Sequence, residues 1–444
     1  MHSTKTIAAI ATPLIPSAIG IIRVSGPDTI NVANTLFKTN ILPENYRKMI
    51  TSQAYSKNDT ILDECCYTFY KGPHSYTGED VLEIFCHGSI YIVKELLKII
   101  TAMPDCVLAK NGEFTQRAFI NGKIPLSKAE SILDIIESNS EATHSIALNQ
   151  YTGHVYESIS NCREQLLTLL QKVEASLEFP DDVGGIQRET VLKDCSDIIM
   201  DLTPIIKASD YGALVKKGLK YLIIGEPNVG KSSLLNKLSG ESRSIVSETA
   251  GTTRDYIDIC IEYNGILITL IDTAGIRETN SDIEKVGINK IKELSASTDG
   301  YILVTDCNKD QPFEWPDFLD QSKPIVNVQN KIDQLKHSKH TGQLGISCKT
   351  GKGLTELKET LISTFIDPSQ YEPKQMLCNL RQITALNDAF SYIKEAKKHI
   401  ETHATLDIVC IDLRDAIESL SDIMGDTFTE ELLDGIFSKF CIGK

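Results

Sequence analysis

The pattern of hydrophobic and polar positions divides the chain into segments of different types. Near the N-terminus, strand-like runs at Thr6–Ala11, Ala18–Val24 and Val81–Phe85 are separated by helical stretches and Gly/Pro turns, which predicts an α+β segment. From Ser127, which opens an S-x-x-E capping box, apolar residues recur at helical spacing. We therefore expect a long helical region that ends near Gly212.

A different pattern begins near Gly218 and continues to about residue 370. Helices are expected to return after this segment, with a second capping box at Thr427 and Glu430. An α/β segment between two helical segments suggests an insertion, so the two helical parts are expected to form one domain. Four short apolar runs have the pattern of buried parallel strands in a nucleotide-binding sheet: Tyr221–Ile224, Leu267–Ile271, Ile302–Val304 and Ile325–Val328.

Composition narrows the class of protein. With 444 residues, 41% of them hydrophobic and 24% charged, a multidomain globular protein is expected. No apolar stretch reaches the roughly 20 residues of a membrane span, and no signal peptide is recognisable, so we expect a cytoplasmic protein. Twelve cysteines without a C-x-x-C pair predict reduced thiols. The net charge of -15 argues against nonspecific coating of nucleic acid, although a local basic patch could receive an RNA.

The sequence G-E-P-N-V-G-K-S at residues 225–232 follows a predicted strand and opens a predicted helix. This is the context that a P-loop requires. Its glycines let backbone N–H groups face the phosphates, while Lys231 reaches the outer phosphates and the Ser232 hydroxyl ligates Mg²⁺. A glycine-containing turn that matches by chance would lack this strand and helix.

Three further motifs follow in the order typical of GTPases. D-T-A-G begins at Asp272, N-K-I-D begins at Asn330, and S-C-K occupies residues 347–349. The Asp272 carboxylate can hold the Mg²⁺ shell. N-K-I-D resembles the GTPase base-specificity motif, in which the carboxylate, here Asp333, accepts from guanine N1–H and the 2-amino group. Adenine lacks that amino group, so the site would discriminate against ATP.

The segment G-T-T-R-D at residues 251–255 resembles switch I of the same GTPase superclass, which places Thr253 as a second hydroxyl ligand to Mg²⁺. The alternative interpretation is a polar surface loop. The candidate GTP-binding residues are Asn228, Val229, Gly230, Lys231, Ser232, Ser233, Ser247, Thr249, Thr252, Thr253, Asp272, Thr273, Ala274, Gly275, Asn330, Lys331, Asp333, Ser347, Cys348 and Lys349.

The residue after D-T-A-G is Ile276, where Ras-like GTPases have the glutamine that orients the attacking water. Hydrolysis must therefore be very slow, or another group must do this work. Residues 277–284 supply four carboxylates or carboxamides, but position alone does not choose among them. The run could equally be a solvated acidic loop.

Motifs outside this region resemble the MnmE (TrmE) family of tRNA-modification GTPases, over essentially the whole chain. They are A-I-G-I-I-R-V-S-G at 18–26, S-Y-T-G-E-D-V-L-E at 75–83, G-E-F-T-x-R-A-F-x-N-G-K at 112–123 and F-C-I-G-K at 440–444.

The resemblance implies a multidomain α/β and α fold. An N-terminal α+β domain at 1–119 would bind a tetrahydrofolate and dimerise. A central helical domain would be formed by residues 120–215 and 371–444, and a Ras-like α/β P-loop GTPase domain at 216–370 would be inserted in it.

The implied function is that of a potassium-dependent GTPase acting on tRNA as a homodimer. With the flavoprotein MnmG (GidA), expected to carry FAD, it would add a (carboxymethyl)aminomethyl group at carbon five of the wobble uridine. The one-carbon unit would come from a formyl or methylene tetrahydrofolate.

Carried over residue by residue, the resemblance assigns roles to individual side chains. Lys231, Thr253 and Glu284 would be catalytic, with Glu284 positioning the water. Cys441 could act as a nucleophile on the pyrimidine ring, or be a small buried hydrophobe. The remaining assignments are Arg23, Glu83, Lys123 and Lys444 to the folate, Ser232 and Thr253 to Mg²⁺, and Asn228, Ser247, Thr249 and Thr252 to K⁺.

The chain departs from the family pattern at three places. Residues 14–17 read L-I-P-S where the family has a Gly/Arg-rich loop, H-G-S at 87–89 replaces H-G-G, and Pro125 replaces an aspartate. A basic contact expected at residues 14–17 is therefore absent.

A different class, the ribosome-assembly or RNA-binding GTPases, shares the GTPase motifs but carries a KH domain after them, where this chain has helices and C-I-G-K.

Overall fold

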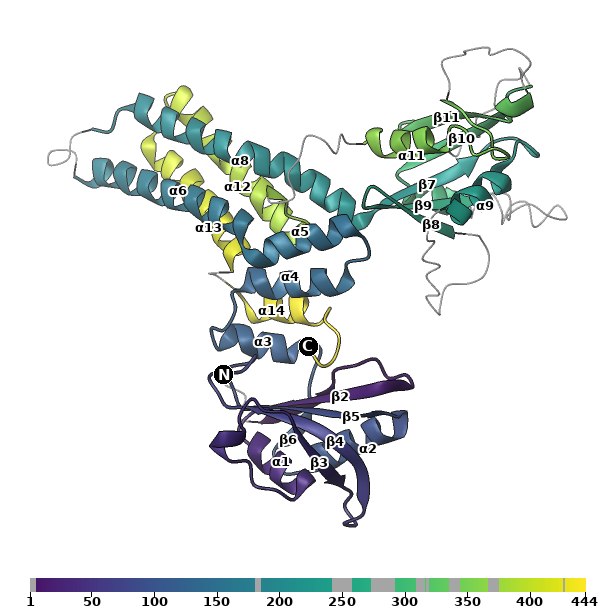
Figure 1. Ribbon diagram of the computed structural model, residues 1–444. Helices are drawn as coiled ribbons and strands as arrows, with labels where there is room; N and C mark the ends of the chain where they lie inside the picture. The colour runs from purple at the N-terminus through teal and green to yellow at the C-terminus, as the bar shows by residue number, and fades with distance from the viewer. Residues whose placement is uncertain are drawn as a thin grey trace. The chain divides into compact units, whose positions relative to one another are not determined.

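Two units make up the chain (Figure 1). The first unit combines Met1–Leu133 with Ser421–Lys444, and the second unit is Asp134–Leu420. Both ends of the chain therefore belong to the first unit. The computed structural model describes residues 5–179, 185–241, 258–272, 292–308, 316, 319–334, 344–365, 375–425 and 428–444.

The first unit is built on a mixed sheet with the strand order β3-β4-β5-β2-β1-β6. Neighbouring strands are antiparallel except for β1 and β6, which are parallel. Helices α1 (Thr29–Phe37) and α2 (Ile90–Thr101) bury their apolar sides in the core of this unit. The strands are β1 (Thr6–Ile10), β2 (Ser17–Ser25), β3 (Ile50–Tyr55), β4 (Ile61–Tyr70), β5 (Val81–Gly88) and β6 (Cys106–Leu108), and a 3-10 turn lies at Pro43–Asn45.

The end of the chain packs beside an early helix of the same unit. Helices α3 (Glu113–Ile120), α4 (Leu126–Glu137) and α14 (Glu430–Phe437) contribute to one apolar cluster. Gly112, just before α3, has a φ of 65°, and a Cβ at this position would collide with the backbone of Phe437. Glycine therefore satisfies both the left-handed backbone and the close approach of α14.

Long helices form one part of the second unit. In α8 (Arg188–Lys217) the buried residues Val191, Cys195, Ile198 and Leu202 recur every three or four positions, which gives the helix an apolar stripe. This helix contacts both α6 and α12. The other helices of this part are α5 (Glu141–Thr152), α6 (His154–Glu178), α12 (Leu380–Glu401) and α13 (Leu406–Met424).

The other part of the second unit is an α/β sheet with the strand order β12-β11-β10-β7-β9-β8. All neighbouring strands are parallel except β8 and β9. The elements are β7 (Leu219–Ile224), α9 (Lys231–Glu241), β8 (Asp258–Tyr263), β9 (Ile266–Asp272), β10 (Gly300–Asp306), β11 (Ile325–Asn330), a 3-10 turn (Ile332–Gln334), β12 (Leu344–Gly345) and α11 (Leu354–Ser363).

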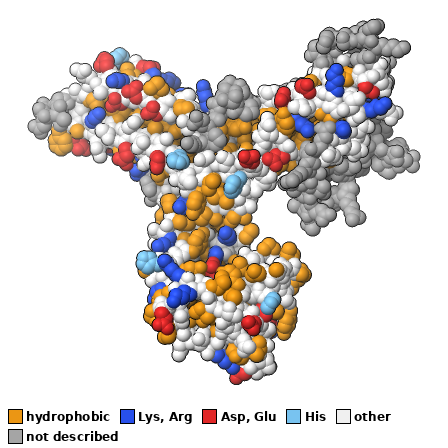
Figure 2. Space-filling view, in the orientation of Figure 1, with side chains coloured by type: hydrophobic (Ala, Val, Ile, Leu, Met, Phe, Trp, Pro, Cys, Tyr) orange, Lys and Arg blue, Asp and Glu red, His pale blue; other side chains and the backbone are white. Residues whose placement is uncertain are grey.

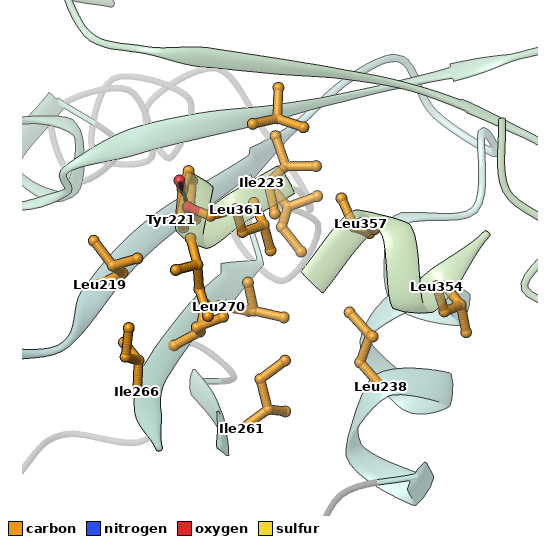
Figure 3. Close-up of a cluster of buried hydrophobic side chains, with 14 of the residues drawn as sticks. Leu219, Tyr221, Ile223, Leu238, Ile261, Ile266, Leu270, Leu354, Leu357 and Leu361 are labelled. Atoms are coloured by element: carbon orange, nitrogen blue, oxygen red, sulfur yellow. Dashed lines mark hydrogen bonds between the residues drawn. The ribbon is translucent and has the colours of Figure 1, made fainter. Parts of the chain in front are cut away.

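Side-chain alternation along β7 gives this sheet two cores. Leu219, Tyr221 and Ile223 join the cluster that α9 and α11 cover, whereas Leu222 and Ile224 join the cluster on the opposite face. Figure 3 shows the first cluster, with Tyr221 among the leucines of neighbouring elements. The Tyr221 hydroxyl is buried and donates to the Leu361 carbonyl at 2.6 Å.

The expected fold class is confirmed, and each predicted strand of the α/β sheet is present with slightly longer bounds. The helical region expected to end near Gly212 continues in α8 to Lys217. The capping box at Ser127 is wrong, because α4 begins at Leu126 and the Pro125 carbonyl accepts from the Ala129 N–H.

The burial of Leu126 against Gly425 accounts for this earlier start. Thr427 lies outside the described residues; the observed cap of α14 is Thr429, whose side chain accepts from the Leu432 N–H. Among the helices that the structure describes, none combines the length and the apolar composition of a membrane span.

Tyr221→Phe should destabilise the α/β part of the second unit by about 1–3 kcal/mol, because it leaves a buried carbonyl without its donor. Tyr263→Phe is the matched control, since Tyr263 lies on the same sheet and its hydroxyl makes an exposed hydrogen bond to Glu359. This control should change the free energy of unfolding by less than about 0.5 kcal/mol. Urea unfolding followed by circular dichroism measures both. Equal losses for the two variants would contradict the role given to the Tyr221 hydroxyl.

Candidate functional site

The nucleotide candidates lie where four neighbouring parallel strands end. The P-loop follows β7, while β9, β10 and β11 end at Asp272, Asp306 and Asn330. Because the carboxyl ends of parallel strands share one edge of a sheet, these groups lie along the same edge. The order β11-β10-β7-β9 places the P-loop strand between the strands that end in the N-K-I-D motif and in Asp272.

Backbone geometry explains the glycines of the P-loop. Gly225 has a φ of 147° and faces the Val304 carbonyl, and Gly230 has a φ of 102° and faces the side chain of Asn330. A Cβ at either position would collide with its neighbour. Asn228 also has a positive φ, of 66°, a region that asparagine tolerates better than most residues. The loop can therefore curl tightly, with its glycines close to β10 and to Asn330.

Lys231 points into this curl. Its side chain is buried, and Nζ donates to the carbonyls of Gly225 and Glu226 at 3.0 and 2.8 Å. The ammonium is therefore held within the loop that, in P-loop proteins, receives the outer phosphates. Such a placement suits a side chain that must neutralise charge on a transferring phosphoryl group.

Ser232 and Asp272 bring two oxygen ligands together. The Ser232 hydroxyl donates to Asp272 Oδ2 at 3.0 Å, and Asp272 is only 3% exposed. A hydroxyl and a carboxylate are hard oxygen donors of the kind that Mg²⁺ prefers. These residues fit the expected Mg²⁺ site, in which Ser232 would bind the ion and Asp272 would hold its coordination shell.

Asn330 connects three loops through its buried amide. Its Nδ2 donates to the Val229 carbonyl at 2.9 Å, and its Oδ1 accepts from the backbone N–H of Lys331 at 2.8 Å and of Cys348 at 3.3 Å. The side chain is 2% exposed. One asparagine therefore fixes the P-loop relative to both segments expected to surround the base.

Lys331 makes a second connection across this edge. Its Nζ donates to the Asn228 carbonyl at 3.0 Å and to Asp306 Oδ2 at 2.7 Å. Burial alone would raise the pKa of Asp306, but hydrogen bonds from Lys331 and Asn308 outweigh this effect and hold the pKa below its usual value. Sequence reasoning missed Asp306, although its position two residues after the predicted strand Ile302–Val304 was a usable signal.

Asp333 is exposed and its carboxylate is oriented by a neighbour. The buried Ser347 hydroxyl donates to Asp333 Oδ1 at 2.6 Å and accepts from the Thr350 N–H. Cys348 is half-buried, and burial raises the pKa of its thiol, so it serves as a small uncharged residue beside the base motif. The arrangement leaves Asp333 on the surface, aimed by Ser347.

The candidate residues of the two switch segments fall outside the described residues. The other GTP candidates, Val229, Ser233 and Lys349, lie in the P-loop, the start of α9 and the S-C-K loop. The structure therefore joins the P-loop, Asp272, N-K-I-D and S-C-K elements into one site. The residues outside the description are Ser247, Thr249, Thr252, Thr253, Thr273, Ala274, Gly275, Ile276 and Glu284.

A second site lies on the sheet of the first unit. Arg23 on β2 and Glu83 on β5 are direct cross-strand partners, so their side chains share one face. Arg23 Nε and Nη2 donate to Glu83 Oε1 at 3.0 and 2.8 Å. Arg23 Nη1 also donates to the carbonyl of Gly443 at 3.3 Å. The C-terminal segment is thereby bound beside the pair.

Three of the four folate candidates meet here. Lys444 is half-buried, and burial together with the positive charge of Arg23 lowers the pKa of its ammonium. Lys123 is exposed and donates to the Pro73 carbonyl at 2.9 Å. Cys441 is also exposed, which excludes its interpretation as a buried hydrophobe and leaves its chemical role untested.

The residues of this face fit an acidic heterocycle such as a folate. Glu83 can accept N–H groups, and Arg23 and Lys444 provide positive charge. Cations suit carboxylate recognition. In such a site Arg23, Glu83 and Lys444 would hold the ligand.

Comparisons with known proteins decide the family. A family model described as the MnmE helical domain matches residues 126–441, and one described as the GTP-binding protein TrmE N-terminus matches residues 6–123. The tRNA modification GTPase MnmE of Clostridioides difficile (strain 630) is 37% identical over 461 aligned positions, which cover 100% of both chains. That of Fervidobacterium nodosum is 36% identical over 452 positions, covering 99% of this chain and 97% of the relative.

The chain belongs to the MnmE family of tRNA modification GTPases.

MnmE membership confirms the resemblance expected from the motifs. Among solved structures, the G domain of the Thermotoga maritima FeoB iron transporter is 27% identical and matches 33% of this chain and 99% of that one. Its TM-score is 0.25.

Asn330→Ala should weaken GTP binding by about tenfold or more, because it removes bonds to the P-loop and to the S-C-K loop of this MnmE chain and leaves their backbone groups unpaired. Asn327→Ala, which removes an exposed amide from the same strand β11, serves as the control. Isothermal titration with a nonhydrolysable GTP analogue measures both affinities. Unchanged affinity in Asn330→Ala would contradict its connecting role.

Proposed function

We propose that this chain is the potassium-dependent GTPase subunit of a complex that modifies the wobble uridine of tRNA. With the flavoprotein MnmG it adds a (carboxymethyl)aminomethyl group at carbon five, using a one-carbon unit carried by tetrahydrofolate. The observation that carries this proposal is the coexistence, in one MnmE-family chain, of a guanine-nucleotide site and a separate Arg23–Glu83–Lys444 face.

Nucleotide selection depends on Asp333. Its carboxylate, oriented by the Ser347 hydroxyl, accepts the N1–H and 2-amino groups of guanine. ATP would leave this acceptor unpaired and is therefore disfavoured. Lys231 would bind the outer phosphates, and Ser232 with Asp272 would hold a Mg²⁺ ion, which would neutralise charge on the phosphates.

Hydrolysis needs a substitute for the missing glutamine and for an arginine finger. Asn228 is exposed at the tip of the P-loop and can offer a side-chain carbonyl to K⁺, with Ser247, Thr249 and Thr252 completing the site. A cation held there would supply the positive charge that an arginine supplies in other GTPases. Glu284 would then position the attacking water.

The first unit is proposed to bind the folate and to pair with a second copy of the chain. Exposed apolar side chains at the start of β2 and of α2 support this pairing, because apolar surface of this kind marks interaction sites. Hydrophobic side chains gather on the visible face of this unit (Figure 2). The exposed residues are Leu14, Ile15, Ile19, Ile90 and Tyr91.

Mass spectrometry of bulk tRNA tests the function. A strain without this chain should lose the wobble-uridine adduct, and expression of the wild-type chain should restore it, whereas Lys231→Ala should not. Normal tRNA in the deletion strain would instead favour a regulatory GTPase that binds RNA without covalent chemistry.

Asp333→Asn should raise the Kd for GTP by about 100-fold or more and narrow the preference over ATP, because an amide cannot accept from both guanine donors. Asp320→Asn is the control, because Asp320 is also exposed and its carboxylate also accepts a hydrogen bond from a serine, Ser322. Competition titrations with GTP and ATP measure the selectivity. An unchanged preference in Asp333→Asn would exclude this carboxylate from base recognition.

GTP hydrolysis should be faster in potassium than in sodium at equal ionic strength, by roughly tenfold or more, because the cation stabilises charge in the transition state. The Asn228→Ala variant should hydrolyse GTP slowly and should lose the preference between the two cations. The Glu284→Ala variant should also hydrolyse GTP slowly, but its binding of a transition-state analogue should still be stronger in potassium than in sodium. Phosphate-release assays give the rates; equal wild-type rates in the two salts would remove potassium from the mechanism.

A further inference from the structure

Two motifs of the first unit have no direct place in the proposed chemistry: S-Y-T-G-E-D at residues 75–80 and F-T-x-R at residues 114–117. We propose that Arg117 and Tyr76 are positioning residues that orient Arg23 toward the folate. This inference rests on the proposed folate site and extends it to residues that do not themselves bind the ligand.

Arg117 anchors the loop at 72–80 from within the core of the unit. Its side chain is 6% exposed, and Nη1 donates to both carboxylate oxygens of Glu79, at 3.2 and 3.0 Å. Nη2 donates to Glu113 at 2.8 Å, and Nη1 also donates to the Lys5 carbonyl at 3.0 Å. A guanidinium that contacts three groups at once fixes their relative positions.

Glu79 carries this constraint to β2. The Ser25 hydroxyl donates to Glu79 Oε2 at 2.7 Å, and a 2.7 Å hydrogen bond joins Ser25 Oγ to Thr77 Oγ1. Ser25 lies two residues after Arg23 on β2, so it points to the same face of the sheet. The loop is thus fastened to α3 at one side and to the Arg23 strand at the other.

Tyr76 lies between these attachments and covers Arg23. Its ring is 5.6 Å from the guanidinium carbon, and a 2.9 Å hydrogen bond joins its hydroxyl to Thr115 on α3. Phe114, adjacent on the same helix, is fully buried and lies 5.8 Å from the guanidinium carbon. Helix α3 therefore provides Phe114 beside Arg23, holds Tyr76 through Thr115 and holds the loop through Arg117.

The arrangement restricts Arg23 on several sides. Glu83 binds Nε and Nη2, the Gly443 carbonyl binds Nη1, and the two rings limit tilting of the guanidinium plane. The positions of both rings depend on α3 and on the loop at 72–80. Loss of the hydrogen bonds from Arg117 to Glu79 and Glu113 should therefore release Arg23 without removing a direct contact with the ligand. A lysine retains the charge at position 117 but cannot donate to both carboxylates as a guanidinium does.

A double-mutant cycle on the full-length chain tests the proposal. The Kd for 5-formyltetrahydrofolate is measured by isothermal titration for the wild type, Arg23→Ala, Arg117→Lys, Tyr76→Ala and the two double variants that contain Arg23→Ala. Thermal unfolding of each variant shows which are folded. Lys38→Ala, which removes an exposed ion pair with Asp59 in the same unit, is the control.

We expect Arg117→Lys and Tyr76→Ala each to weaken binding by about tenfold, and each to have less than about a twofold effect when Arg23 is already alanine. Losses that add in full to the Arg23→Ala loss would overturn the proposal, because the residues would then act independently of Arg23. Unchanged affinity in both single variants would overturn it as well. If Arg117→Lys does not fold, the Tyr76 cycle decides alone. Failure of the wild type to bind the folate would instead refute the proposed folate site.

Discussion

The buried amide of Asn330 is the interaction on which the nucleotide site depends. It binds the P-loop carbonyl of Val229 on one side and the backbone N–H of Cys348 on the other. Parallel strands deliver these segments to one edge of the sheet, but strand ends alone do not set loop positions to within a hydrogen bond. The amide does so, and Lys331 strengthens the arrangement by joining Asn228 to Asp306.

The first unit uses cross-strand pairing for the same purpose. Antiparallel register places Arg23 opposite Glu83, and the returning C-terminal segment contributes the Gly443 carbonyl and Lys444. Gly443 has a φ of 97°, and a Cβ there would collide with the backbone of Ile10. The small residue in C-I-G-K therefore lets the last residues reach the sheet.

Much of the fold and of the nucleotide site could be predicted from the sequence, since local patterns determine both. Apolar runs predicted the strands of the α/β sheet, and the P-loop, N-K-I-D and S-C-K motifs identified residues that the structure brings together. The contacts of Arg23 with Glu83 and Gly443 could not be derived locally, because they join residues 60 and 420 positions apart. The capping box at Ser127 failed because burial of Leu126 moved the start of the helix.

A crystal structure of the chain with GDP-aluminium fluoride, Mg²⁺, K⁺ and 5-formyltetrahydrofolate tests the central claim most directly. The account predicts guanine against Asp333, phosphates against Lys231, and the folate against Arg23, Glu83 and Lys444. A nucleotide bound away from the P-loop edge, or a folate bound away from the Arg23–Glu83 face, would contradict it.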